Sequence, residues 1–428
     1  MLRASIAATV IVFAAVAGFA GPQDPGGSAN RAASGQSAAP PADIERTDWL
    51  TFAHGALFVR QSGMAVGSSS RVLGMIDGDS RKLTLSTDAG DPIELVYGLP
   101  ADTTFDRFAI PNVVETPGNA TFFRTVVISG SLEGSDAGYQ VLASAELETH
   151  GPDQQTTVLV PDLVAPVRWV KVNLANGINI EPGHEGRTNL EFTEVIGYGV
   201  QEVYPLSTAF SGVWDFRLAE RPDMRGTPFA LRQTGSTLSG CLGTATLHGT
   251  INGSIARATG VDAATGRPVA VILVADDDGA IHGAWSQNNR VFGARTAVVD
   301  PAVESPCAED LPPPAACGSM VYLNFDIDSA VIRPESYQVL SDLYNRLLAA
   351  WRVNVSIVGH TSTEGTEDYN LALSERRAQA VVDDLVGRGY DASTISATGR
   401  GESEPLIQRD DTESARSINR RVEIDCQR

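Results

Sequence analysis

The side chains best suited to chemistry gather near the C-terminus, in four short polar motifs. The motifs are Gly359-His360-Thr361-Ser362-Thr363-Glu364-Gly365, Tyr369-Asn370, Leu373-Ser374-Glu375-Arg376-Arg377-Ala378 and Asn419-Arg420-Arg421-Val422-Glu423. A planar guanidinium such as that of Arg377 suits bidentate recognition of a carboxylate. His360 has no cysteine or second histidine nearby to share a metal ion. We therefore interpret His360 as a strand-end residue that forms hydrogen bonds and shapes its loop.

The segments around these motifs alternate between strand and helix patterns. Val321–Phe325 is predicted to be a short strand of apolar and aromatic residues, and Pro334 stands where a helix can begin. Two helices are predicted from apolar residues that recur on one face: Val339, Leu340, Leu343, Leu347 and Leu348 in the first, and Leu373, Ala378, Val381, Val382 and Leu385 in the second. Gly387 and Gly389 end the second helix. Strands are predicted at Val353, Val355 and Ile357 and at Val422 and Ile424, which alternate with polar residues. This order indicates a layered α/β unit.

Together, the four motifs resemble the OmpA-type (OmpA/Pal/MotB) peptidoglycan-binding domain. The resemblance covers Val321–Arg428, about a quarter of the chain. It implies a βα-βα-ββ sandwich that holds the cell-wall stem peptide without cutting it. It also implies a ligand-binding set, which is Asp328, Thr361, Ser362, Glu364, Asn370, Arg377 and Arg420.

The resemblance assigns roles within this set. Arg377 stands three residues after the serine of Leu373-Ser374 and would bind the carboxylate of diaminopimelate. The family's aspartate, which binds the amine, is replaced here by Ser362. We expect Ser362 to weaken wall binding without abolishing it, with Asp328 or Glu364 supplying the missing charge. Of these two acids we favour Asp328, although both could simply be solvated loop acids. Asn370 is expected to cap or orient the following helix, and only one of Arg420 and Arg421 can face the groove.

Length and charge constrain the rest of the chain. The 428 residues predict two to four domains. The net charge of −20 argues against nucleic acid and anionic membrane surfaces as partners. Met1–Ala20 reads as a secretory signal and residues 21–44 as a flexible linker, although an uncleaved N-terminal anchor is an alternative. We expect a mature chain that begins near Gly21, in the periplasm or at the inner face of the outer membrane.

The middle of the chain is predicted to be all-β. Residues 45–203 contain short strand patterns separated by turns, which favours an antiparallel sandwich. The order of the strand motifs along the chain resembles that of the discoidin or galactose-binding-like jelly roll. The motifs run from Met75-Ile76-Asp77-Gly78-Asp79 to Glu194-Val195-Ile196-Gly197-Tyr198-Gly199. Residues 206–299 are predicted to form a β-meander or a small, partly closed barrel. Residues 300–316 are predicted to be a Pro-rich spacer that precedes the unit at 317–428. An outer-membrane barrel over residues 45–299 is an alternative, but the strands are short and aromatics few.

Four cysteines fit an exported protein. Three disulfide pairings are possible among Cys241, Cys307, Cys317 and Cys426, and free thiols are a further alternative. The resembled fold places the strands beside Cys317 and Cys426 next to each other. It therefore implies a Cys317–Cys426 bond, which leaves Cys241 to pair with Cys307.

Two functions from different classes remain open. One is a non-enzymatic envelope protein that binds peptidoglycan through Val321–Arg428, with its β domains facing a glycan or an outer-membrane protein. The other is a wall- or glycan-modifying enzyme that uses this domain for targeting. No nucleophile elbow, phosphate loop or zinc motif appears. We therefore expect a binding protein without a cofactor or metal ion.

Overall fold

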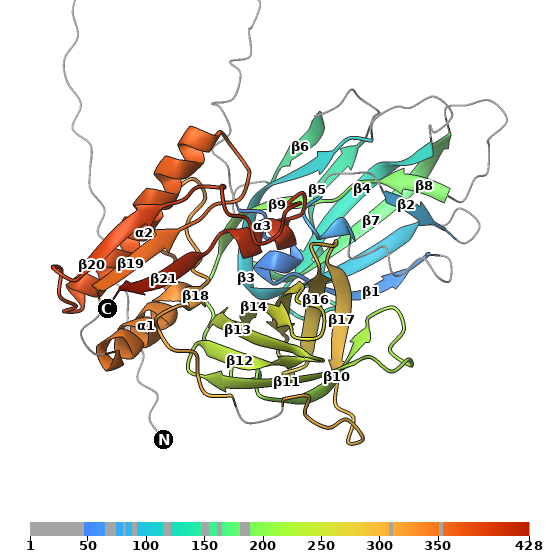
Figure 1. Ribbon diagram of the computed structural model, residues 1–428. Helices are drawn as coiled ribbons and strands as arrows, with labels where there is room; N and C mark the ends of the chain where they lie inside the picture. Colours follow the sequence, from blue (N-terminus) through green and yellow to red (C-terminus); the bar gives the residue numbers. More distant parts are fainter. Residues whose placement is uncertain are drawn as a thin grey trace, which may run out of the picture. The chain divides into compact units, whose positions relative to one another are not determined.

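The computed structural model describes residues 47–64, 74–79, 83–87, 92–113, 121–147, 154–160, 165–179, 189–307, 311–350 and 354–427. The predicted signal and the linker that follows it lie outside these residues. Three groups of strands follow one another along the chain (Figure 1). We refer to them as the first β-module, the barrel module and the α/β module. None of the helices in the described ranges is long and apolar enough to cross a membrane.

The first β-module is a nine-stranded sheet with a short 3-10 helix, η1 (Phe52–His54), before it. Its strands are β1 (Leu57–Ser62), β2 (Leu83–Ser86), β3 (Ile93–Pro111), β4 (Thr121–Ser131), β5 (Gln140–Glu146), β6 (Gln155–Leu159), β7 (Val167–Asn179), β8 (Asn189–Phe192) and β9 (Ile196–Gln201). The long strand β3 pairs with β1 and β7 in its first half and with β6 and β9 in its second. One pairing departs from the antiparallel prediction, because β4 and β8 meet in parallel at Phe122 and Glu191.

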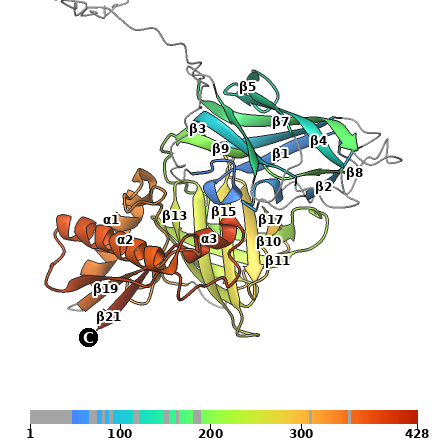
Figure 2. The ribbon, with the colours of Figure 1, turned by 90° about the horizontal axis from the view of Figure 1, so that it is seen from above.

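The barrel module is a closed ring of eight strands, each paired with the next along the chain. They are β10 (Gly212–Leu218), β11 (Thr227–Thr234), β12 (Thr237–Leu242), β13 (Ala245–Asn252), β14 (Ile255–Asp262), β15 (Pro268–Ala275), β16 (Ile281–Gln287) and β17 (Gly293–Val298). β10 and β17 pair and close the ring, so the predicted meander is fully closed (Figure 2). Buried apolar side chains such as Phe216, Phe229 and Leu247 form its core.

The α/β module has a four-stranded sheet in the order β18-β21-β19-β20. Its elements are β18 (Met320–Val321), η3 (Pro334–Ser336), α1 (Tyr337–Ala349), β19 (Asn354–Gly359), α2 (Glu367–Gly387), β20 (Ile395–Gly399), α3 (Glu413–Asn419) and β21 (Val422–Gln427). α1 and α2 cover one face of the sheet (Figures 1 and 2). The apolar residues predicted for the second helix are all buried, whereas Leu348 of the first helix is 53% exposed.

Two local predictions in this module are wrong, for identifiable reasons. The first strand ends at Val321 instead of Phe325, because the backbone of Tyr322 bonds to the barrel module. Its N–H donates to Thr250 Oγ1 at 2.9 Å and its carbonyl accepts from Asn252 Nδ2 at 2.8 Å. Asn370 does not cap α2, since the side chain of Thr366 accepts the bond from Tyr369 N–H. Asn370 lies within the first turn.

Both predicted disulfides are present. Cys317 and Cys426 are joined with their Cα atoms 5.4 Å apart, and Cys241 and Cys307 are joined at the same Cα distance. The first bond closes 109 residues of sequence and ties the start of the α/β module to its last strand. Both distances lie in the range that a disulfide requires.

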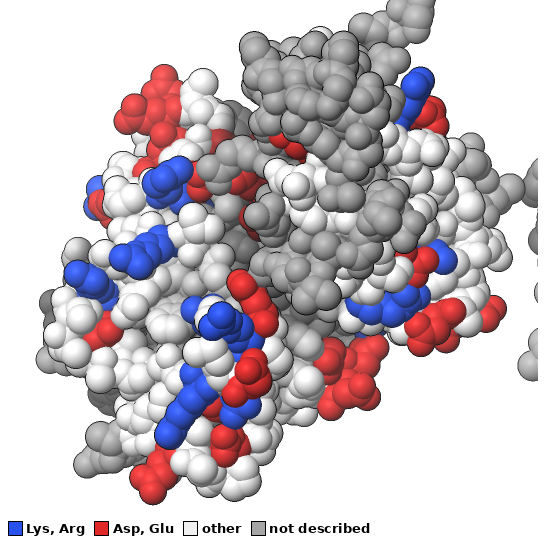
Figure 3. All heavy atoms as spheres, turned by 90° about the vertical axis from the view of Figure 1, so that its right-hand side faces the viewer, with Lys and Arg blue, Asp and Glu red and all other residues white. Residues whose placement is uncertain are grey.

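Charged side chains are interspersed on the face shown in Figure 3. Acidic and basic atoms lie next to one another there, without a broad area of one sign. Arg124 and Glu146, whose Nε and Oε2 atoms lie 2.9 Å apart, form one ion pair on the first β-module. On that face the net negative charge is therefore not concentrated in one field.

Candidate functional site

A cavity of about 370 Å³ lies where the three modules meet, and we call it the shared cavity. All seven residues of the predicted ligand-binding set line it. The α/β module supplies them from the loop after β18, the loop after β19, α2 and the end of α3. The first β-module adds Asp48, Thr51, His54 and Glu194, and the barrel module adds Ile255 and Arg257. The sequence did not reveal these additional walls.

Arg377 is a nearly buried cation in this cavity. It lies on α2 with 8% of its surface exposed, and its Nε donates to the carbonyl of Ser329 at 2.9 Å. Its guanidinium carbon lies 5.0 Å from the centre of the Phe325 ring. Burial lowers the pKa of Arg377 to about 10, so it remains charged at neutral pH. Among the described residues, no carboxylate lies within ion-pair distance of it. A buried cation without an anion is suited to binding a carboxylate from a ligand.

The position of the family's aspartate is occupied by a buried serine with an acid beside it. Ser362 is 4% exposed, and its hydroxyl donates to Glu364 Oε2 at 3.2 Å. Glu364 also lies 3.3 Å from Arg416 Nε and 3.5 Å from Arg420 Nη1. A carboxylate is therefore present next to Ser362, but two arginines already balance its charge.

Asp328 belongs to the loop after β18. It is exposed, has a positive φ of 55°, and accepts a hydrogen bond of 2.5 Å from the hydroxyl of Tyr369. This bond is the main reason that the pKa of Tyr369 is raised. Asp328 and Tyr369 both line the cavity, so the predicted first-loop acid lies in its wall.

Two further members of the predicted set are buried. Thr361 is 3% exposed, and its Oγ1 has no hydrogen-bond partner among the described residues. A ligand that reaches this hydroxyl would supply the missing hydrogen-bond partner. Asn370 donates to Glu402 through Nδ2, which fixes its amide. His360 is absent from the cavity wall; burial lowers its pKa to about 4, so it is neutral at neutral pH.

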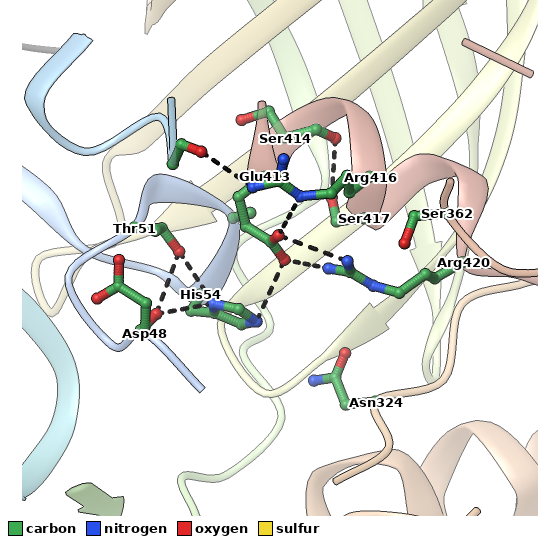
Figure 4. A network of polar contacts seen from close by, with 12 residues as sticks. Asp48, Thr51, His54, Asn324, Ser362, Glu413, Ser414, Arg416, Ser417 and Arg420 are labelled. Carbon is green, nitrogen blue, oxygen red and sulfur yellow. Dashed lines mark hydrogen bonds and ion pairs between the residues drawn. The ribbon is translucent and has the colours of Figure 1, made fainter. Parts of the chain in front are cut away.

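Helix α3 carries a charged network that connects the cavity to the first β-module (Figure 4). Glu413 bonds to Arg420 and lies 3.1 Å from Arg416 Nε and 3.7 Å from His54 Nε2. Burial lowers the pKa of His54 to about 4, so its contact with Glu413 is not an ion pair at neutral pH. Arg416 Nη2 donates to the carbonyl of Gly78 at 2.9 Å.

Gly78 shows how closely the two modules approach. Its φ is +74°, and an added Cβ would lie 2.5 Å from Glu413 Cβ. The Glu413 N–H donates to the carbonyl of Asp77 at 2.8 Å, so backbone as well as side chains join the modules. The spacing of Glu413, Arg416 and Arg420 by three and four residues was a visible signal that they share a helix face.

Arg257 joins all three modules from strand β14. Its Nη2 donates to the carbonyl of Ala53 at 2.9 Å, and its Nη1 donates to Asn324 Oδ1 at 3.2 Å. It is 3% exposed, and burial lowers its pKa to about 10. Arg257 therefore holds one wall of the cavity in place while adding a second buried cation to it.

The network on α3 predicts a pH-dependent contribution to stability. Burial alone would raise the pKa of Glu413, but the charges of Arg420 and Arg416, joined below about pH 4 by that of His54, outweigh it and lower the pKa from 4.5 to about 2. A lowered pKa stabilises the folded state above pH ~4.5, and this stabilisation is lost as pH falls toward 2. Arg416 and Arg420 keep Glu364 as a partner, so we expect Glu413→Gln to cost roughly 2 kcal/mol at pH 7.

Denaturant unfolding of wild type and Glu413→Gln between pH 7 and pH 2.5 measures this contribution. The difference in unfolding free energy should shrink as pH falls below ~4.5. A difference that stays constant over this range would show that the charge of Glu413 does not stabilise the fold.

The fold and the cavity define an α/β module at the end of a β-rich chain, with the nearly buried Arg377 in the cavity wall. A model of the OmpA family matches residues 324–420. Outer membrane protein A of Bordetella avium is 33% identical over 152 residues, which cover 33% of this chain and 78% of that protein. The chain belongs to the OmpA family.

Two further relatives each match about a quarter of the chain. Outer membrane porin F of Pseudomonas fluorescens is 41% identical over 101 residues, which are 24% of this chain and 31% of the porin. The chain thus spans less than a third of the length of that relative. The crystal structure of the peptidoglycan-associated lipoprotein from Burkholderia pseudomallei covers 25% of this chain and 89% of its own, with 29% identity and a TM-score of 0.23.

Proposed function

We propose that this chain is an exported cell-envelope protein that binds peptidoglycan non-covalently through its α/β module. The observation that carries this proposal is Arg377, a buried cation without a carboxylate partner among the described residues, in a cavity that an OmpA-family domain lines together with the two other modules. A diaminopimelate carboxylate is a ligand of the right charge and geometry for such a guanidinium. The partner is therefore the peptidoglycan stem peptide.

The proposal includes a location and excludes a catalytic role. Relatives named outer membrane protein A and outer membrane porin F support a place in the cell envelope, which we assign to the periplasm beside the cell wall. The chain would connect the wall to the outer membrane or to another envelope partner. Its first β-module, which we interpret as galactose-binding-like, and its barrel module would contact that glycan or protein partner. Binding, with no bond broken, is the whole of the proposed activity.

Co-sedimentation with purified peptidoglycan sacculi tests the proposal. The chain without residues 1–20 should pellet with the sacculi, and an excess of soluble stem tripeptide ending in diaminopimelate should release it. An unrelated acidic protein of similar size controls for trapping in the pellet. The proposal fails if the chain remains in the supernatant at sacculus concentrations that pellet a known wall-binding protein.

A further inference from the structure

Glu194, in the first β-module, is a buried carboxylate in the wall of the shared cavity. It follows β8 and is 3% exposed. Within the described part of the chain, no hydrogen bond or ion pair engages its carboxylate. Burial, followed by the charges of Asp48, Asp77 and Asp79, raises its pKa well above the ordinary range, and Arg416 opposes this effect. A buried acid without a donor is costly to the fold, which makes it a candidate for binding a ligand.

The neighbouring acid Asp48 has a different role. Its Oδ1 accepts hydrogen bonds from Leu50 N–H at 3.0 Å and from Gly197 N–H at 2.8 Å. These bonds fix the chain before η1 against β9. Asp48 is therefore held by the protein itself, whereas the carboxylate of Glu194 remains for a ligand.

The cavity thus contains a buried arginine, Arg377, and a buried glutamic acid, Glu194, and neither has an ion-pair partner among the described residues. They come from different modules, α2 of the α/β module and the β8–β9 connection of the first β-module. The cavity, of about 370 Å³, has room for one amino-acid head group with its side chain. A ligand with both an ammonium and a carboxylate would satisfy both residues.

We propose that Glu194 binds the ammonium group of a zwitterionic ligand whose carboxylate is bound by Arg377. The identity of the ligand rests on the proposed function: the diamino acid of the stem peptide carries both groups. The acid that the family places at Ser362 is then supplied by the first β-module. The binding site is a composite of two modules, and the first β-module selects ligands with a free amine.

Calorimetric titration of the chain without residues 1–20 tests this assignment with two probes. One probe is the muramyl tripeptide with a free amine on its terminal diaminopimelate, and the other is the same peptide with that amine acetylated. For wild type, acetylation should weaken binding at least about tenfold, since the charge-assisted bond is lost. Glu194→Gln should weaken binding of the free-amine probe by about the same factor. Acetylation should then have little further effect on the variant.

Two matched variants make the outcome specific. Glu202→Gln changes an exposed acid outside the cavity and should leave both affinities unchanged. Glu364→Gln tests the rival acid beside Ser362 and should preserve the effect of acetylation. The assignment is overturned if wild type does not distinguish the probes, or if Glu364→Gln and not Glu194→Gln removes the distinction. Failure of wild type to bind either probe would instead overturn the proposed function.

Discussion

Arg377→Ala is expected to weaken binding to sacculi by roughly 30- to 700-fold, which corresponds to about 2–4 kcal/mol. The wild-type guanidinium is nearly buried and has no carboxylate partner among the described residues, so a ligand carboxylate would be its counter-ion. Removing the guanidinium leaves that carboxylate in the cavity without its bidentate donor. Co-sedimentation across a range of sacculus concentrations measures the loss.

The adjacent residue supplies a matched control. Arg376 is exposed on the same helix and does not line the cavity, so Arg376→Ala should bind sacculi as wild type does. Arg377→Lys keeps the charge but loses the planar fork, and an intermediate affinity is expected. Melting temperatures of the three variants separate loss of binding from loss of folding. Equal binding by Arg377→Ala and wild type would show that the module recognises its ligand in another way.

Removal of the Cys317–Cys426 disulfide should produce the largest loss of stability. The bond spans 109 residues, and the loop-closure model gives about 4.8 kcal/mol for a loop of that length. The double variant Cys317→Ser/Cys426→Ser should therefore unfold at a much lower denaturant concentration than wild type. Urea unfolding followed by the fluorescence of the five tryptophans measures the change.

The second disulfide is the natural comparison. Cys241 and Cys307 are separated by 66 residues, for which the same model gives about 4.3 kcal/mol. The two double variants should thus lose similar amounts of stability, with the Cys317–Cys426 loss slightly larger. If neither variant is less stable than wild type, the bonds do not contribute through restriction of the unfolded chain.

Local patterns in the sequence predicted the α/β module well. The apolar periodicity of the second helix is found in the structure, as is the Cys317–Cys426 bond, which the family resemblance implied. Prediction failed where contacts between modules replace local rules. Tyr322 bonds to Thr250 and Asn252, which lie about 70 residues away, so its strand ends earlier than its composition suggested.

The walls of the cavity could not be predicted from the sequence for the same reason. The predicted set of seven residues lines one cavity, but the other walls, which include His54, Glu194 and Arg257, depend on contacts between segments far apart in the chain. No periodicity or short motif encodes such contacts, because they depend on how complete modules pack. Glu194 in particular reads in the sequence as an ordinary acid after a strand, and only its burial beside the cavity distinguishes it.

Ser362 replaces the family's aspartate, and the two acids predicted to compensate for it already have partners. Glu364 lies beside Ser362 but is paired with Arg416 and Arg420, and Asp328 is bonded to Tyr369. Both acids that the sequence suggested as replacements are therefore already engaged. We therefore propose that the acid missing at Ser362 is replaced by Glu194 of the first β-module and not by an acid of the adjacent loops.

Calorimetric titration of the chain with the soluble stem tripeptide measures binding in the cavity alone, because it removes the wall itself and leaves one ligand and one cavity. Binding should be saturable with one site per chain, lost in Arg377→Ala and retained in Arg376→Ala. Binding that is absent in wild type, or that is unchanged in Arg377→Ala, would contradict the proposed function.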